Sequence, residues 1–177
     1  MEFIDTEIPD VKIIKGRRFP DDRGFFSEQY KEKLFSEHGI PHFVQDNMSE
    51  SRAGVVRGLH WQADPFGQGK LVTCLTGSII DVAVDVRPNS PYYGKHVAVT
   101  LDSREAISLW VPVGFAHGFQ SLEEGTRVFY KVTNYWNKES ERALNPLDPA
   151  LGISWSKKEF ILSDKDAEAP NFEAVVH

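Results

Sequence analysis

The chain has 177 residues, of which 41% are hydrophobic and 26% charged, and its formal net charge is -6. This length and composition predict one globular domain that buries a core without disulfides or metals. The acidic balance gives no basic face for nucleic acid, so any phosphate has to be met by a few placed cations.

The lack of a recognisable targeting segment and the single cysteine predict a cytoplasmic protein. The N-terminus lacks a basic segment followed by an apolar one, and no apolar run approaches the roughly 20 residues of a membrane helix. We therefore expect a soluble protein with no membrane partner. The single cysteine, Cys74, lies in an apolar run, which predicts a small buried residue in a reducing compartment.

Short runs rich in β-branched and aromatic residues, separated by Gly, Pro, Asn and Asp, predict many short strands. In the clearest, residues 78–87, the even-numbered apolar side chains should face the core and the odd-numbered ones solvent or a polar pocket. The predicted strands are residues 11–15, 24–30, 43–48, 53–61, 71–75, 78–87, 94–101, 106–111, 118–121 and 126–133. Their number and order favour an antiparallel jelly roll over a parallel sheet.

Helical signals are few. The first half of the chain has one strong candidate, Lys31 to His38, ended by Gly39 and Pro41. From Asn145 onward the sequence is richer in Pro, Asp and Ser, so this segment should wrap the barrel with short helical turns.

The segment Arg57-Gly58-Leu59-His60-Trp61-Gln62, followed by Lys70, carries the strongest chemical signal. A histidine can accept a proton near neutral pH, and a buried lysine can hold negative charge on an oxygen. Strict alternation would put Arg57 and His60 on opposite faces, so a shared site requires a bulge at Gly58. The alternative is a histidine satisfied within the core.

A second histidine, His117, lies in a glycine-punctuated turn between two predicted strands, where ligands are often met. His60 and His117 would give two ligands of a metal site, but a working site generally needs three or four. Gln62 stands where a second nearby histidine would be expected. We therefore predict no bound metal.

Four further segments carry weaker signals. Tyr130 is a weak acid that can protonate a carbanion, or else it packs in the core. Arg23 and Phe26 suit a nucleotide clamp, although a solvated turn explains them equally well. Gln45-Asp46-Asn47 offers amide groups for a pyrimidine edge. The acidic turn 162–166 could orient an imidazole or simply cap a helix.

These segments together resemble the dTDP-4-dehydrorhamnose 3,5-epimerase family over nearly the whole chain. Each matching segment is short, but their joint occurrence in the right order is highly specific. The segments are Asp22-Arg23-Gly24-Phe25-Phe26, Gln45-Asp46-Asn47, Arg57-Gly58-Leu59-His60, Lys70-Leu71-Val72, residues 81–87, residues 114–119, Tyr130-Lys131 and Ser163-Asp164-Lys165-Asp166.

The resemblance implies an all-β, cupin-type jelly roll (a double-stranded β-helix) with a few short peripheral helices. It would form one epimerase domain over residues 1–177, with residues 145–177 wrapping the barrel, and a homodimer with strand exchange. The implied enzyme is an isomerase without metal or organic cofactor. It would epimerise C3 and C5 of dTDP-4-dehydro-6-deoxy-D-glucose, giving dTDP-4-dehydro-L-rhamnose for rhamnose biosynthesis.

The resemblance also implies residue roles. His60 would remove the proton beside the C4 ketone with Asp166 holding its imidazole, Tyr130 would return a proton from the opposite face, and Lys70 would stabilise the enolate. Arg57 and His117 would contact the sugar or phosphate. The nucleotide and substrate would be bound by Arg23, Glu28, Gln45, Asn47, Glu141 and Lys165, with Phe26 and Tyr135 sandwiching the thymine.

Departures from the family pattern leave alternatives open. Trp61 and Trp136 stand where a smaller aromatic residue and a tyrosine are frequent, so C3, C5 or both carbons could be inverted. A monofunctional 3- or 5-epimerase of another deoxysugar pathway is the first alternative. A non-catalytic cupin that binds a sugar nucleotide is another, and a metal-dependent cupin enzyme, which requires a stoichiometric metal, is the third.

Overall fold

The computed structural model describes residues 1–156 and 159–174, and its principal elements are strands. They are β1 (Glu2–Asp5), β2 (Lys12–Lys15), β3 (Arg18–Asp21), β4 (Gly24–Ser27), β5 (Gln45–Ser51), β6 (Val56–Gln62), β7 (Lys70–Thr76), β8 (Ser78–Asp85), β9 (His96–Asp102), β10 (Ile107–Val111), β11 (Phe115–Ser121), β12 (Thr126–Val132) and β13 (Glu141–Ala143). The all-β prediction is confirmed.

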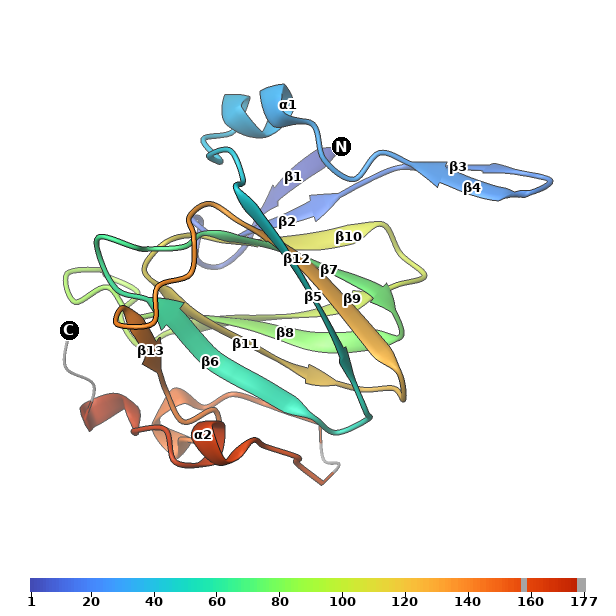
Figure 1. The fold of residues 1–177 in the computed structure, drawn as a ribbon. Helices are drawn as coiled ribbons and strands as arrows, with labels where there is room; N and C mark the ends of the chain where they lie inside the picture. Colours follow the sequence, from blue (N-terminus) through green and yellow to red (C-terminus); the bar gives the residue numbers. More distant parts are fainter. Residues whose placement is uncertain (157–158, 175–177) are drawn as a thin grey trace.

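Two sheets pack face to face to form the barrel (Figure 1). The larger has the order β1-β2-β10-β7-β12-β5 and the smaller β13-β6-β11-β8-β9. Neighbouring strands within both sheets run antiparallel, for example β12 against both β5 and β7. The predicted strands are all present, with shifted ends, whereas the short β1, β3 and β13 escaped prediction.

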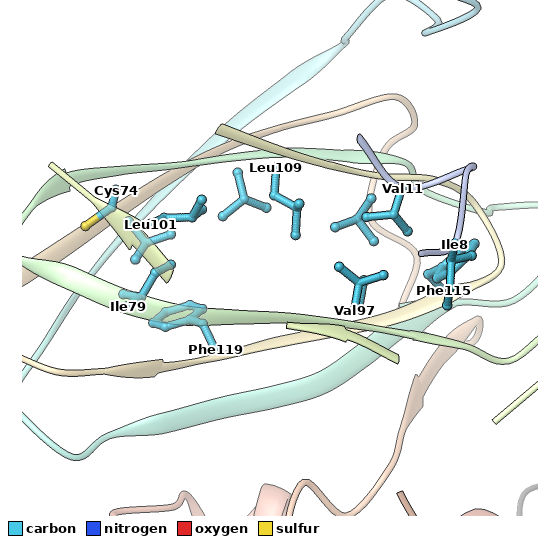
Figure 2. Close-up of a cluster of buried hydrophobic side chains, with 13 residues drawn as sticks. Ile8, Val11, Cys74, Ile79, Val97, Leu101, Leu109, Phe115 and Phe119 are labelled. Carbon is cyan, nitrogen blue, oxygen red and sulfur yellow. The ribbon is translucent and has the colours of Figure 1, made fainter. Parts of the chain in front are cut away.

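The main core fills the space between the two sheets. Figure 2 shows Leu109 and Cys74 from the larger sheet meeting Ile79, Val97 and Phe119 from the smaller one. Each is at most 4% exposed, and burying such a side chain stabilises the fold by about 2 kcal/mol. Burial also raises the pKa of the Cys74 thiol to about 11, so Cys74 is the inert core residue that its sequence context predicts.

Strand β8 corrects one expectation, because both of its faces are buried. The odd-numbered Ile79 and Ala83 point into the core between the sheets. The even-numbered Val82 packs on the other side, in a second cluster with Leu144 and Leu151. The side chains of β8 therefore alternate as predicted, but the predicted surroundings of its two faces are wrong. A distant segment of the chain covers the outer face of the smaller sheet, so neither face meets solvent.

That covering segment, which we call the C-terminal strap, comprises residues 145–156 and 159–174. It contains the short helices η1 (Pro149–Leu151), α2 (Asp164–Ala167) and η2 (Phe172–Ala174) and lies beneath the smaller sheet (Figure 1). Backbone hydrogen bonds from Val56 N–H to Ile161 and from Ile161 N–H to Gly54 fasten it to β6. Residues 157–158 and 175–177 of the expected wrap lie outside the described residues.

The N-terminal part adds a helix and a hairpin. Helix α1 (Glu32–Glu37) lies within the predicted range, and Phe35 anchors it in a third apolar cluster. The β3–β4 hairpin projects away from the barrel (Figure 1). No helix in the part of the chain described here is long and apolar enough to cross a membrane.

Candidate active site

One cavity of about 470 Å³ opens between the two sheets and the C-terminal strap. Its walls come from β5, β7 and β12 of the larger sheet, β6, β11 and β13 of the smaller sheet, and α2. Most of the predicted site residues line it: Gln45, Asn47, Arg57, His60, Lys70, His117, Tyr130, Glu141, Lys165 and Asp166. The fold thus gathers in one concave site residues that are up to about 120 positions apart in the sequence.

A bulge at Gly58 brings Arg57 and His60 to the same cavity. Arg57 pairs with Phe119 and His60 with His117, so β6 uses three steps where β11 uses two. Gly58 has φ +114°, and a Cβ there would lie 2.6 Å from Gly118 Cα. Only glycine fits this backbone, because a side chain would meet both strain and a clash. The sequence required a bulge at Gly58 if Arg57 and His60 were to share one site, and the structure contains that bulge.

His60 and Asp166 form a hydrogen-bonded pair. His60 Nε2 lies 2.6 Å from Asp166 Oδ1, and Gly58 N–H points at the other carboxylate oxygen from 3.5 Å. Burial opposes ionisation of Asp166, but hydrogen bonds from His60, Ser163 and Gly58 outweigh it and hold the pKa of Asp166 below its usual value. The resulting carboxylate accepts the Nε2 proton, which leaves the Nδ1 lone pair free to act as a base.

Tyr130 faces the cavity from β12, on the sheet opposite His60. Burial raises the pKa of its phenol, and the nearby Arg57 only partly offsets that effect. The phenol is therefore protonated throughout the neutral range and can donate a proton. A base and an acid stand on opposite walls of one cavity.

Lys70 supplies a buried cation from β7. It is 7% exposed, and its Nζ donates a hydrogen bond to the backbone oxygen of His60 at 2.9 Å. Burial lowers the pKa of Lys70 to about 8, while the charges of Asp81 and Glu141 oppose this fall. At neutral pH the ammonium group is still mostly charged, so it can stabilise an oxyanion in the cavity.

The remaining polar lining is ordered by hydrogen bonds and ion pairs. His117 Nε2 lies 2.7 Å from Asp81 Oδ1, and Arg57 Nε donates to Ser51 Oγ at 3.0 Å. Gln45 Nε2 donates to Asn47 Oδ1 at 2.9 Å on the edge strand β5. At the rim, Lys165 pairs with Glu141 at 2.7 Å. These contacts hold cations and amides ready for a polar ligand.

Four predicted binding residues do not line this cavity. Arg23 and Phe26 belong to the projecting hairpin and its turn, where the Phe26 residue is 67% exposed. Glu28 follows the hairpin and is also exposed. Tyr135 is 64% exposed, and its neighbour Trp136 lines the cavity instead. Within one chain, the predicted aromatic sandwich is therefore not assembled.

The sequence reasoning also omitted some residues of the cavity wall. Ser49 continues the every-second-residue pattern of Gln45 and Asn47 on β5, and that alternation could have revealed it. Gln62 and Gln68 line the wall without any local signal. Among residues 1–156 and 159–174, no group of three or more His, Cys, Asp and Glu side chains is placed to hold a metal ion.

Comparison with known proteins identifies the family. The model of the family described as dTDP-4-dehydrorhamnose 3,5-epimerase matches residues 5–174. The chain belongs to this family. It is 48% identical over 174 residues to the dTDP-4-dehydrorhamnose 3,5-epimerase of Sinorhizobium fredii. The aligned region covers 97% of this chain and 89% of the relative.

Solved structures of the family share the fold. The dTDP-6-deoxy-D-glucose-3,5-epimerase from Legionella pneumophila, in complex with dTDP-4-keto-L-rhamnose, has a TM-score of 0.95 and 43% identity over 99% of this chain and 94% of that chain. A 3'-monoepimerase from Streptomyces bikiniensis, in complex with dTDP-quinovose, has a TM-score of 0.90 and 30% identity, covering 96% and 87%. The cupin-type jelly roll is therefore confirmed, and the chain is an isomerase of the epimerase type.

Proposed function

We propose that residues 1–177 act as one dTDP-4-dehydrorhamnose 3,5-epimerase domain, which converts dTDP-4-dehydro-6-deoxy-D-glucose to dTDP-4-dehydro-L-rhamnose. One observation carries the proposal: the His60–Asp166 pair and Tyr130 stand on opposite walls of one cavity that also holds the Lys70 cation. Inversion at carbon needs a base on one face and an acid on the other.

The first step would be proton abstraction. His60 Nδ1 takes the proton from the carbon beside the C4 ketone, and the C–H electron pair forms an enolate whose negative charge rests on O4. A proton next to a ketone is too weak an acid for imidazole unless that charge is stabilised. Lys70 supplies the stabilisation, and loss of one such partner typically raises the barrier by about 3 kcal/mol.

The second step would be reprotonation from the other wall. The enolate carbon takes the phenolic proton of Tyr130, the C4 carbonyl re-forms, and the configuration is inverted. Solvent then restores the phenol proton and removes the imidazolium proton. Protons and electrons balance within this cycle, and we propose that it proceeds without metal or organic cofactor.

The charged and aromatic lining suits the nucleotide part of the substrate. Arg57 and His117 would contact the phosphate or the sugar, and Gln45 and Asn47 would contact polar groups of the nucleotide. At the rim, Trp136 offers a stacking surface for the thymine beside the exposed Tyr135. The Lys165–Glu141 pair can re-partner with the ligand.

Deuterium incorporation tests the reaction. After incubation with dTDP-4-dehydro-6-deoxy-D-glucose in deuterated water, we expect label at both C3 and C5, read by NMR, and none with the His60→Asn variant. Label at one carbon would instead support a monofunctional epimerase. Tight binding with no label at either carbon would overturn the enzymatic proposal in favour of a sugar-nucleotide-binding cupin.

We further propose a homodimer in which strands are exchanged and the β3–β4 hairpin of one protomer completes the cavity of its partner. Phe19, Phe25 and Phe26 of this hairpin are 46%, 56% and 67% exposed, and exposed apolar patches of this kind mark interaction sites. The nucleotide clamp implied for Arg23 and Phe26 lies on this same hairpin, away from its own cavity.

Mixing two inactive variants tests this arrangement. His60→Asn is combined with the double variant Arg23→Ala/Phe26→Ala under conditions that exchange protomers, and turnover is measured at low substrate. A hairpin acting on the partner gives heterodimers with one intact site, so about a quarter of the wild-type activity should return. No recovery in a mixture shown to contain heterodimers contradicts the shared site.

We also propose that the protein works in the cytoplasm. Its one cysteine is the free, buried Cys74, so the fold uses no disulfide of its own. Cell fractionation with an antibody against the protein should place it with cytoplasmic markers; recovery with an extracytoplasmic fraction would contradict the proposal.

A further inference from the structure

Asp81 is a buried carboxylate with no part in the steps above. It lies on β8 and is 0% exposed, behind the cavity wall. Its Oδ1 accepts a hydrogen bond from His117 Nε2 at 2.7 Å, but its Oδ2 is buried and has no hydrogen-bond partner among the described residues. A buried carboxylate that is only half satisfied is costly, so its presence in the fold calls for an explanation.

Asp85 shows what a purely structural aspartate looks like on the same strand. It lies four residues further along β8, on the same face, and is also 0% exposed. Both of its oxygens are satisfied, because Arg87 bonds to each of them and Ser90 adds a further bond to Oδ2. Asp81 lacks any such permanent cation, even though the two sites share strand, face and burial.

The two basic side chains that interact with Asp81, His117 and Lys70, belong to the cavity. His117 is 8% exposed and Lys70 is 7% exposed, and both line the cavity wall. The hydrogen bond that Lys70 Nζ donates goes to a neutral acceptor, the His60 carbonyl, which does not neutralise its charge. Of the two carboxylates that act on Lys70, Asp81 has the larger effect and favours the charged form of the lysine.

The other carboxylates around Lys70 already bind other side chains. Asp166 is bonded to His60, and Glu141 is paired with Lys165. Arg57 is a further cation in the cavity, and it donates hydrogen bonds to Ser51 Oγ and the Glu50 carbonyl. The titratable groups that line this part of the cavity with Lys70 are Arg57, His60, His117, Tyr130, Glu141, Lys165 and Asp166, and Asp81 lies behind them.

We propose that Asp81 is a positioning residue of the active site: its carboxylate orients the His117 imidazole and supplies the negative charge that keeps Lys70 a cation. With Nε2 held by Asp81, the other ring nitrogen of His117 is left for the ligand. With its charge balanced from behind, Lys70 leaves the cavity side open for the enolate oxygen. This role deepens the proposed function and rests on it.

The test measures the protonation of Lys70 directly. Full-length wild-type protein and the Asp81→Asn variant are labelled briefly with acetic anhydride from pH 6 to pH 10, and acetylation of Lys70 is read by mass spectrometry. Removing the negative charge should lower the pH midpoint for Lys70 by about one unit or more. The alkaline limb of kcat should move down by the same amount. Asp85→Asn is the matched control and should leave the Lys70 midpoint unchanged.

A folded Asp81→Asn variant with an unchanged Lys70 midpoint would overturn the proposal. If that variant does not fold, His117→Gln measured against wild type decides, because it removes the imidazole bonded to Asp81 and keeps the Asp81 charge. A Lys70 midpoint in His117→Gln at or above the one measured for wild type supports the proposal, and a lower midpoint overturns it. Labelling needs no turnover, so failure of the epimerase assay would be seen separately.

Discussion

His60 and His117 occupy paired positions on β6 and β11, and each holds a buried aspartate through Nε2. The pairs differ in access: the His60 side chain is 32% exposed, whereas that of His117 is 8% exposed. A substrate carbon can therefore approach the ring of His60, while His117 is restricted to a contact at the cavity wall. The two histidine–aspartate pairs are chemically alike, but the difference in histidine exposure suits one to proton transfer and the other to ligand contact.

Asp166→Asn should lower kcat by about 10²–10⁴-fold with little change in KM. An amide no longer fixes the imidazole tautomer that leaves Nδ1 free, and it no longer stabilises the imidazolium. Steady-state kinetics with the nucleotide sugar measure the effect. Asp164→Asn is the control, because Asp164 is exposed on the same helix, α2; an equal loss in that variant would point to damage of the helix instead.

Tyr130→Phe should abolish epimerised product while His60-dependent exchange continues at the carbon first attacked. Phenylalanine keeps the packing but has no proton to donate to the opposite face. NMR in deuterated water separates exchange from inversion. Tyr92→Phe, at a partly buried tyrosine packed on the main core, should behave like wild type. Normal product formation by Tyr130→Phe would assign the acid to another group.

The activity should fall as the pH rises through about 8, where Lys70 loses its proton. The enolate needs the charged form, which is present below the pKa. Lys70→Arg keeps its charge at all accessible pH values, so its residual activity should lack this limb. A limb that survives in the arginine variant would belong to another group.

The same lysine should affect stability in the opposite sense. Its folded pKa of about 8 lies below the unfolded value of about 10, so between these values the unfolded state binds more protons. The Lys70 contribution to the free energy of unfolding therefore rises with pH across this window. Urea unfolding of wild type and Lys70→Met from pH 7 to pH 10 measures the difference in their free energies of unfolding. As the pH increases, wild type should gain stability relative to the variant.

Gly58→Ala should destabilise the fold more than Gly125→Ala, although both glycines have positive φ angles of +114° and +68°. At Gly125 a Cβ meets nothing within 4 Å, whereas at Gly58 it would lie 2.6 Å from Gly118 Cα. Gly125→Ala should cost about 1–2 kcal/mol from backbone strain alone, and Gly58→Ala clearly more because of the added clash. Thermal unfolding of both variants, with kinetics on any folded Gly58→Ala protein, makes the comparison. Equal losses would mean that β6 absorbs the added methyl group.

Local pattern predicted much of this molecule. Alternation located the long strands, and the odd spacing of Arg57 and His60 required the bulge that Gly58 provides. Burial on both faces of β8 could not be predicted in this way, because it depends on a strap more than 60 residues further along the chain. The role of Asp81 was hidden for the same reason: an aspartate on a strand looks exposed until its neighbours are known.

The residues that we propose bind the nucleotide show another limit. Gln45, Asn47, Glu141 and Lys165 line the cavity as the family resemblance implied, whereas Arg23 and Phe26 lie on a hairpin that leaves the barrel. Sequence likeness implies that these residues meet the same ligand. It does not say whether one chain or two supply them, because that is decided by the direction in which a short hairpin leaves its anchor.

The partner of His60 is delivered by the strap, 106 positions further along the chain. A folding intermediate with a complete barrel but an undocked strap would possess the histidine, the lysine and the tyrosine, yet its imidazole would rotate freely. Turnover would then begin only when the last part of the chain docks. The return of activity during refolding should therefore report the docking of the C-terminal strap. It should lag behind the burial of tryptophan in the barrel.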